Sequence, residues 1–403
     1  MKSYIKLQNM LGFGDTHLLS ALLEKFKSPA GILSASDEEL LACGLKKSQV
    51  KRKNSMSDKE AEKIINKCQK NNVWIIPYGH KNFPKKLMNI ETPPVVIYGI
   101  GEIFDFDKNL SLALVGTRKI SEFGKRAAFS LSARLSLANS IIISGGAIGC
   151  DSFAHLGALA AGGKTVAVTG GGVLSPYLKA NKKLRDDIIK YGGALISEFT
   201  PDYVPRFKNS FQIRNRIIAA LSQAVVVIEA PAGSGAIITA NAAADIGRDV
   251  YVLSGKPNEL QYEGSNRLIN EGAFLLQSPR QIIENFKFKY NDISIESMDI
   301  ISGNRLKELY LKAIARYTEK EKNKILSKTK EEKTTKASDK KEIEKFLLGN
   351  ELIVFKAFQK EEMLSDEIIE KTMLGAAEVI KTLTLLEIKG VIEALPGSRY
   401  KLK

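Results

Sequence analysis

A short apolar strand that runs into a glycine-rich turn occurs four times between residues 111 and 253, and this repetition constrains the fold more than any other feature. The strands are β-branched runs without polar alternation, which is typical of a parallel sheet buried on both faces. The four units are Leu112–Val115 with Gly116, Ile141–Ile143 with Gly145, Thr165–Val168 with Gly170, and Ala224–Glu229 with Gly233. Helical segments separate them, so we expect a doubly wound, Rossmann-like α/β domain with a mostly parallel sheet.

The glycine-rich turns also predict where a ligand binds. In a parallel sheet the carboxyl ends of the strands share one edge, and glycines there allow backbone N–H groups to approach a ligand. The helices that follow the turns begin at the same edge, and helix N-termini favour anions. The sequence therefore predicts a phosphate-binding crevice at this edge of the sheet.

Composition narrows the class of partner. The 403 residues carry a formal net charge of +15 with a pI of about 9.4, which favours a polyanion, nucleic acid before a membrane surface. A generally basic proteome or a soluble tail would also produce this balance. The three cysteines form no CxxC pair and there are three histidines, so we expect no metal site and no cofactor. We find no signal-like or membrane-length apolar run and expect a cytoplasmic protein.

The flanking segments predict further domains. Residues 1–70 show helix-spaced apolar positions and predict a small helical domain of the SAM or helix-hairpin-helix kind. Its turn at Gly12 and Gly14 suits either contact with a nucleic-acid backbone or a purely structural αα-hairpin. Residues 71–290 form the expected α/β domain. Residues 291–341 are interpreted as a charged linker, because residues 318–341 are nearly all Lys, Glu, Ser and Thr.

Residues 342–403 regain apolar periodicity. Three helical stretches are followed by a β-hairpin that turns at Pro396, Gly397 and Ser398, and this order is typical of a winged helix. Because its third helix carries few basic side chains, contact with a protein and contact with duplex DNA both stay open.

Two local patterns resemble catalytic motifs in the wrong setting. The run from Ala158 to Thr165 resembles a Walker A loop, but it ends a helix and leads into a strand, so we interpret it as a helix C-cap and expect no ATP hydrolysis. Asp151 and His155 stand four residues apart on one helix. We interpret Asp151 as a helix N-cap in structural contact with His155, rather than as half of an acid–base pair.

The segment from Arg206 to Arg216 combines cations with aromatic rings. Arg214, Asn215 and Arg216 open a helix whose later face is apolar, with Lys208 and Phe211 just upstream. Cations interleaved with aromatic residues beside glycine-rich turns suit phosphates and a stacked base, which is how single strands are held. The alternative is that Phe207 and Phe211 belong to the core and the cations are solvated.

Ordered motifs over some 160 residues resemble the DNA-processing protein A (DprA/Smf) family. They are Gly116-Thr117-Arg118, the turn from Ser144 to Asp151, Tyr177 with Asn181, Ser197-Glu198, Phe211 to Ser222, Glu229 to Ala240, and Gly264 to Ala273. The chain departs from the family where Ile148 replaces a frequent Arg and Leu178 a frequent Pro. Losing that Arg removes a cation from the rim of the crevice.

The resemblance implies a non-enzymatic protein that binds single-stranded DNA, protects it, and loads the RecA recombinase onto incoming DNA in natural transformation. It also implies a homodimer in the cytoplasm of a competent cell. The DNA-binding residues expected on motif and chemistry are Gly116, Thr117, Arg118, Ser144, Gly145, Gly146, Lys208, Phe211, Asn215, Arg216, Ser234 and Gly235.

Two other functions stay open. The fold also resembles the cytokinin-activating phosphoribohydrolases, which are nucleotide-processing enzymes, although the catalytic Glu of their glycine loop has no counterpart after Gly235. The third function is a DNA-bound regulator that works through the winged helix. Base release from a nucleoside monophosphate would identify the enzyme, and a preference for duplex DNA the regulator.

Overall fold

A computed structural model describes residues 1–176, 181–205, 209–317, 347, 349–358, 362–372, 374–389, 391–395 and 397–402. The chain divides into two compact units, Met1–Ala315 and Arg316–Lys403. Lys208 and Tyr177, which the sequence analysis singled out, lie outside the described residues, as does the charged segment 318–341.

A nine-stranded sheet in the order β1-β2-β6-β5-β4-β3-β7-β8-β9 forms the centre of the first unit. The strands are β1 Trp74–Pro77, β2 Val96–Gly101, β3 Ser111–Val115, β4 Ile141–Ser144, β5 Thr165–Val168, β6 Ala194–Ser197, β7 Ala224–Val227, β8 Asp249–Val252 and β9 Phe274–Leu275. Each neighbouring pair in the run β6-β5-β4-β3-β7-β8-β9 is parallel. By contrast, β2 is antiparallel to both β1 and β6. The predicted Rossmann-like, mostly parallel sheet is confirmed.

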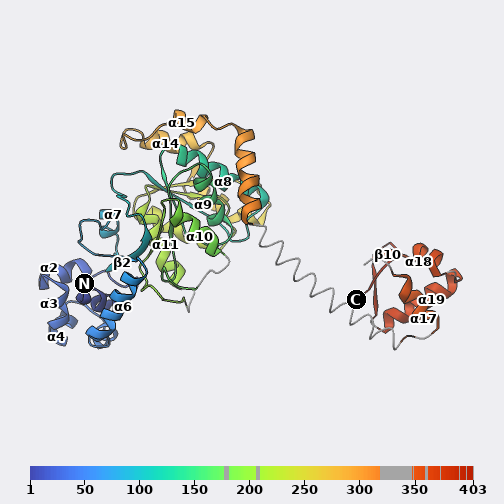
Figure 1. Cartoon of the computed structure of the whole chain (residues 1–403), viewed down its shortest axis with the longest axis horizontal. Coiled ribbons are helices and arrows are strands. Elements are labelled where there is room, and N and C mark those ends of the chain that lie inside the picture. Colours follow the sequence, from blue (N-terminus) through green and yellow to red (C-terminus); the bar gives the residue numbers. More distant parts are fainter. Residues whose placement is uncertain are drawn as a thin grey trace. The chain divides into compact units, whose positions relative to one another are not determined.

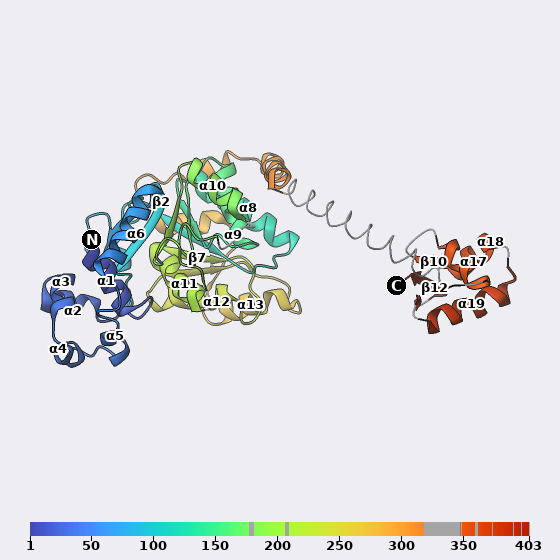
Figure 2. The same cartoon turned by 60° about the horizontal axis from the view of Figure 1, so that its bottom comes forward.

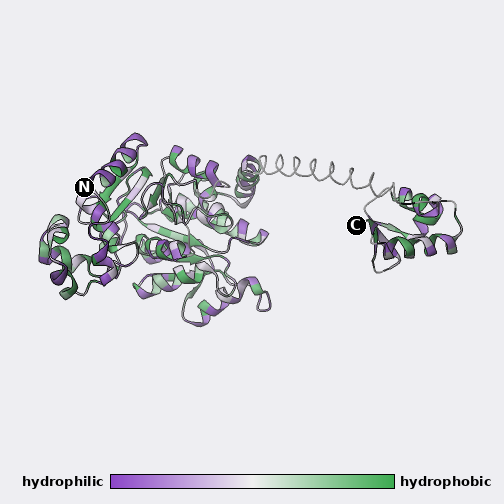
Figure 3. Ribbon diagram, turned by 90° about the horizontal axis from the view of Figure 1, so that it is seen from below, coloured by the Kyte–Doolittle hydropathy of each residue, from purple (hydrophilic) through white to green (hydrophobic). Residues whose placement is uncertain are grey.

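Helices cover both faces of this sheet. They are α8 Glu122–Leu137, α9 Cys150–Ala160, α10 Lys182–Lys190, α11 Asn209–Leu221, α12 Gly235–Asp245, α13 Glu263–Asn270 and α14 Pro279–Phe286. Figure 2 shows α8, α9 and α10 on one side of the strands and α11, α12 and α13 on the other. β3, β4, β5 and β7 are buried at every position, as expected for strands covered on both faces. Figure 3 shows these central strands as largely hydrophobic ribbon.

The direction of winding changes between β3 and β7. From β3 the chain proceeds through β4 and β5 to β6, and it then returns to the other side of β3 to form β7. Ala113 of β3 pairs with Ile143 of β4 on one side and with Val225 of β7 on the other. Helices leave such adjacent strands on opposite faces, so a crevice opens at the carboxyl ends of β3 and β7.

The N-terminal helices form a cluster against the antiparallel edge of the sheet (Figure 1). They are α1 Lys2–Leu11, α2 Leu19–Phe26, α3 Pro29–Ser34, α4 Asp37–Ala42, α5 Lys47–Lys51 and α6 Asp58–Lys70. Capping boxes at Ser36 and Ser57 start α4 and α6, because Ser and the Glu three residues later satisfy the first free N–H groups. Gln8 of α1 donates hydrogen bonds to the carbonyls of Val96 and Glu198, which ties the helices to β2 and the end of β6.

Residues 291–317 differ from the expected charged linker. They include α15, Glu296–Asp299, whose Met298 is buried in the same core as α8 and α14. The helical stretch 303–317 follows, and its Tyr310 packs edge-on against Phe129 at 5.4 Å. The expected linker began too early, because the Lys- and Glu-rich composition starts only at residue 318, whereas residues 291–317 contain closely spaced apolar side chains such as Met298, Leu306 and Tyr310.

The second unit has its own core. Its helices and strands are α17 Asn350–Ala357, β10 Glu362–Leu364, α18 Ser365–Thr372, α19 Ala376–Ile388, β11 Ile392–Leu395 and β12 Arg399–Leu402. The strands form an antiparallel sheet in the order β10-β12-β11. Val354, Ile368 and Leu383 bring α17, α18 and α19 into one buried cluster, and the predicted winged helix is confirmed.

Candidate nucleic-acid interface

A pocket of about 490 Å³ lies at the carboxyl ends of β3 and β7. Its walls come from the turns after β3, β4 and β7 and from the helices α9, α11 and α12. Seven of the expected DNA-binding residues line it, namely Gly116, Thr117, Arg118, Phe211, Asn215, Ser234 and Gly235. The topology therefore brings together residues that lie up to 119 positions apart in the sequence.

Arg118 and Phe211 meet across the pocket. The Arg118 guanidinium carbon lies 5.0 Å from the centre of the Phe211 ring, within the range of a cation–π contact. Arg118 is exposed and Phe211 half-buried, so both side chains present surface to solvent. A fixed cation beside a flat apolar ring can receive a phosphate and a base together.

The turn after β7 is open toward the pocket. Gly233 has a φ of 71°, which favours glycine, and an added Cβ at Gly233 or Gly235 would meet nothing within 4 Å. Ser234 caps α12 by accepting a hydrogen bond from the Ala236 N–H at 3.3 Å. The first amides of α12 thus face an accessible rim, where a helix N-terminus favours negative charge.

Arg214 is a buried part of this pocket and connects two further turns. Its Nη1 donates to the carbonyl oxygen of Gly145 at 2.7 Å and to that of Val168. Asp151 lies close by, and its Oδ2 accepts a hydrogen bond from the Ala147 N–H at 3.2 Å. Burial raises the pKa of Asp151, and the positive charge of Arg214 acts in the opposite direction. Arg214 therefore braces the turns after β4 and β5 from within.

The three residues Arg214, Asn215 and Arg216 have separate roles, although the sequence suggested one cationic group. Asn215 donates from Nδ2 to the carbonyl of Gly235 at 3.2 Å, which joins α11 to the turn after β7. Arg216 donates from Nη2 to both carboxylate oxygens of Glu198 at 2.8 Å and does not line the described pocket. Successive helix residues point about 100° apart, so the three side chains diverge.

In the turn after β4, Ala147 lines the pocket, whereas Ser144, Gly145 and Gly146 support it without lining it. Ser144 donates from Oγ to the Leu114 carbonyl at 2.6 Å, Gly145 accepts from Arg214, and Gly146 has a φ of 66°. The lining also includes Arg214 and Asp151, which were not on the expected list. Asp151 stands shortly after the end of β4, which could have indicated it, but the sequence alone assigned it to a helix cap. Arg214 was recognised as part of the cationic segment, but no local signal distinguished it from Arg216.

His155 pairs differently from the expectation. Its Nδ1 lies 2.7 Å from the hydroxyl of Thr165, and that hydroxyl donates to the Ile142 carbonyl at 2.8 Å. Gly149, not Asp151, is the N-cap of α9. Burial lowers the pKa of His155 to about 3. The ring is therefore a neutral core group, positioned by β5 rather than by Asp151.

The Walker-like run does not form a phosphate loop. Gly162 ends α9 with a φ of 74°, and Lys164 is paired with Glu102 at 3.3 Å. Thr165 begins β5 and is buried, with its hydroxyl used by Ile142 and His155. These contacts agree with the interpretation of the run as a helix C-cap.

Neither a metal site nor a membrane-spanning helix occurs in the described part of the chain. No group of three or more His, Cys, Asp or Glu side chains there could hold a metal ion. No helix there is both long and apolar enough to cross a membrane.

The fold and the pocket define a class: a doubly wound α/β protein with a basic, aromatic crevice at its switch point. The family model for DNA recombination-mediator protein A matches residues 74–287, which include the whole parallel sheet. A second model, the DprA winged helix domain, matches residues 349–398. The chain belongs to the DNA recombination-mediator protein A family.

Individual relatives agree with this assignment. The protein named Smf from Escherichia coli is 34% identical over 245 residues, which are 61% of this chain and 65% of that protein. The Smf protein from Synechocystis is 31% identical over 336 residues, or 83% of this chain and 81% of that protein. The X-ray structure of DNA processing protein A from Streptococcus pneumoniae matches with a TM-score of 0.61 and 31% identity, covering 70% of this chain and 97% of that one.

Proposed function

We propose that the chain binds single-stranded DNA in the pocket between β3 and β7, without chemical turnover. Membership of a family of DNA-processing proteins supports DNA as the partner. The contact between Arg118 and Phe211 is the observation that favours single-stranded over duplex DNA. A ring beside a cation can stack an unpaired base while the cation binds its phosphate. The bases of a duplex are already stacked and paired, so they gain less from such a ring.

The remaining lining residues fit this role. The open turn at Gly233 and Gly235 leaves room for a backbone to approach the first amides of α12. Asn215 keeps this turn in place through the Gly235 carbonyl. In this proposal Arg118 and the helix terminus neutralise phosphates, Phe211 stacks a base, and Asn215 fixes the crevice. We assign Lys208 to phosphate binding from its place in the sequence alone.

Nucleotide processing is the alternative enzymatic function. Asp151 is the acidic side chain among the residues that line the described pocket, and its carboxylate is engaged by the Ala147 N–H and the charge of Arg214. The residues after Gly235 are Ala236 and two isoleucines. These features favour binding over catalysis. Release of a free base from a nucleoside monophosphate, abolished by Asp151→Asn, would establish the enzyme instead.

A comparison of single-stranded and duplex DNA of one length, across a salt series, tests the proposal. We expect the single strand to bind about tenfold more tightly or better, since one stacked base contributes ~1–3 kcal/mol. We also expect log K to fall linearly with log salt concentration. Equal or tighter binding of the duplex would contradict the proposal and favour a regulator.

The family resemblance extends the proposal to a partner and an assembly state. We propose that a homodimer delivers the bound strand to a recombinase of the RecA type during natural transformation and recombination. Sedimentation measures the assembly state. Recombinase filament formation on strands covered by single-strand-binding protein measures delivery, and the chain should accelerate it.

A further inference from the structure

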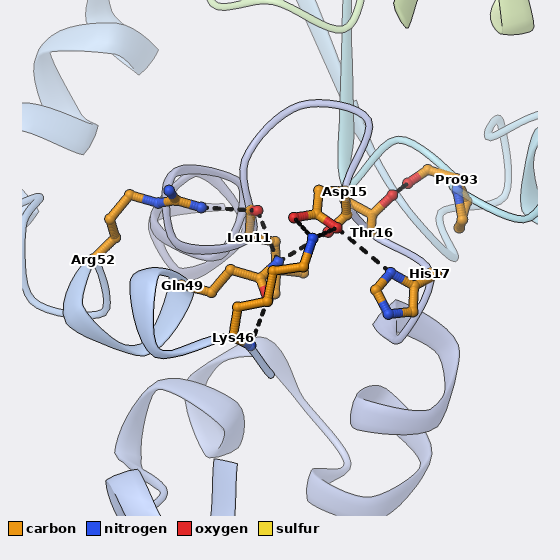
Figure 4. Close-up of polar contacts among 8 residues, drawn as sticks. All are labelled: Leu11, Asp15, Thr16, His17, Lys46, Gln49, Arg52 and Pro93. Atoms are coloured by element: carbon orange, nitrogen blue, oxygen red, sulfur yellow. Dashed lines mark hydrogen bonds and ion pairs between the residues drawn. The ribbon is translucent and has the colours of Figure 1, made fainter. Parts of the chain in front are cut away.

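The turn between α1 and α2, residues 11–17, is held in place by side chains in and next to α5. Gln49 donates from Nε2 to the carbonyls of Leu11 and Asp15 at 3.1 and 3.0 Å. Arg52 donates from Nη2 to the Leu11 carbonyl at 3.1 Å, and Lys46 pairs with the Asp15 carboxylate at 2.8 Å. Figure 4 shows these side chains converging on the turn from α5.

The turn also holds on to the α/β domain. Figure 4 shows Thr16 reaching away from the helices to Pro93, to whose carbonyl its hydroxyl donates at 2.6 Å. Gly14 has a φ of 70°, and an added Cβ there would lie 3.0 Å from Cγ1 of Ile213 in α11. Burial raises the pKa of Glu198, the partner of Arg216, and both Arg216 and the Gly14 N–H act against this rise. The tip of the turn is therefore half-buried against the α/β domain, an arrangement that suits the purely structural interpretation.

Phe13, at the tip, packs into an aromatic cluster that leads to the crevice. Its ring lies 4.7 Å from the ring of Phe199 and 5.6 Å from that of Tyr203. Phe199 and Tyr203 stack on one another at 4.6 Å with 11° between their planes. Such aromatic pairs prefer defined geometries, so Phe13 restricts where Tyr203 lies.

Tyr203 in turn contacts the first turn of α11 and so restricts its position. Its hydroxyl lies 3.3 Å from the hydroxyl of Ser210, the residue before Phe211. Phe211 then faces Arg118 in the pocket. A continuous path of contacts thus runs from the N-terminal helices to the ring that we assign to base stacking.

We infer that Phe13 is a positioning residue for the strand-binding crevice: it holds Tyr203 and the start of α11 so that Phe211 faces Arg118. This inference rests on the proposed function and adds a role for the N-terminal helices. They shape the crevice through the turn at residues 11–17 and need not contact the strand. Phe13 itself does not line the pocket.

The full-length Phe13→Ala variant tests this role with an oligothymidine strand. We expect about threefold to tenfold weaker binding, the range that corresponds to losing one aromatic pair. The slope of log K against log salt should stay unchanged, because no phosphate contact is removed. Phe13→Leu, which keeps most of the volume, should recover part of the loss.

Two further variants separate positioning from general loss of stability. Leu22→Ala removes a buried side chain from α2, so it should destabilise the same helices while leaving strand affinity within about twofold. Tyr203→Phe deletes only the hydroxyl that meets Ser210, and we expect about twofold to tenfold weaker binding. Amide hydrogen exchange at residues 210–214 should rise in Phe13→Ala and Tyr203→Phe but not in Leu22→Ala.

These measurements distinguish failure of the inference about Phe13 from failure of the proposed function. If the parent binds the strand but Phe13→Ala and Tyr203→Phe bind equally well with unchanged exchange, the inference is wrong. If Arg118→Ala leaves binding intact, the proposed function is wrong, and the exchange data still decide whether Phe13 orders α11. Should Phe13→Ala fail to fold, Phe13→Leu and Tyr203→Phe supply the same comparison.

Discussion

Arg118 and Phe211 contribute to the pocket by different physical means. The Arg118 guanidinium can neutralise a phosphate, an interaction that releases counterions and weakens with salt. The Phe211 ring can stack a base, an interaction that depends little on salt. Although the two side chains are in contact, their different dependence on salt allows single substitutions to separate the two contributions.

Replacing Arg118 by alanine should weaken single-strand binding similarly for all base sequences. The slope of log K against log salt should decrease in magnitude by ~0.7, the value for one phosphate contact to a single strand. Lys164→Ala is the matched control, because Lys164 is half-exposed at the start of β5 and paired with Glu102. A slope that changes equally in both variants would show a general charge effect rather than a contact.

Replacing Phe211 by alanine should cost ~1–3 kcal/mol of binding free energy with an unchanged salt slope. Fluorescence anisotropy over a salt series measures both quantities. Circular dichroism must show that the variant remains folded, since a collapsed crevice would lose the stacking and the phosphate contacts together. Loss of slope in a folded Phe211→Ala protein would contradict a pure stacking role.

His155 should make folding stability dependent on acid. Its pKa is lowered to about 3 in the folded chain by burial, against ~6.5 when unfolded. The unfolded state therefore binds more protons between these values, so this contribution is complete above about pH 6.5 and is lost as pH falls toward 3. The expected slope is at most about 1.4 kcal/mol per pH unit.

The variant His155→Asn isolates this contribution. Nδ2 of Asn can still donate toward the Thr165 hydroxyl, but it does not titrate. Urea unfolding of parent and variant at several pH values should show a shallower decline for the variant between pH 6 and 4. Parallel curves would mean that other groups cause the acid sensitivity.

At the scale of elements, α8 and α9 pack so closely that their backbones nearly meet. Gly157 of α9 faces the Phe129 carbonyl of α8, and an added Cβ would overlap that oxygen. Ser132 of α8 donates to the Ala154 carbonyl at the same contact. This close packing holds the turns after β3 and β4 at fixed positions, since α8 begins after the first of these turns and α9 after the second.

Gly157→Ala should therefore destabilise the fold, although alanine is the better helix former. Overpacking of this kind costs about 1–3 kcal/mol, which exceeds the propensity gain of up to about 1 kcal/mol. Gly303→Ala is the control, because an added Cβ there meets nothing within 4 Å. Thermal unfolding measures both, and a Gly157→Ala protein as stable as the parent would show that the helices can separate at little cost.

At the scale of the whole molecule, the chain consists of two units with separate cores. All described residues that line the pocket belong to the first unit. The helix α19 of the second unit contains one Lys, Lys381, and no Arg. The second unit is therefore not expected to contribute to strand binding.

A chain that ends at Tyr317 should bind single strands within a few-fold of the full-length protein. Tyr310 must be kept, because it packs on Phe129 in the first unit. Anisotropy with the same oligonucleotide provides the comparison, and a cooperative thermal transition confirms that the shortened chain is folded. A loss of about a hundredfold, far beyond a few rim contacts, would place the winged helix in the binding site.

Local sequence patterns were sufficient to predict the elements and the edge where the pocket lies. β5 was predicted at its observed bounds, and β3, β4 and β7 within two residues, because buried β-branched runs and glycine turns are local signals. The turns at Gly116 and Gly235 and the side chain of Phe211 were likewise recognisable. The proposal that these residues bind DNA stays a prediction.

Only the tertiary structure decided which of the neighbouring cations faces the pocket. Arg214 and Arg216 look equivalent in sequence, yet one braces the turns after β4 and β5 and the other pairs with buried Glu198. Likewise Phe13 reaches Tyr203 across 190 residues. Such contacts depend on the order of strands and the packing of helices, which arise from long-range burial. Hydrophobic periodicity along the chain cannot predict these contacts, because it indicates only which face of each helix or strand is apolar.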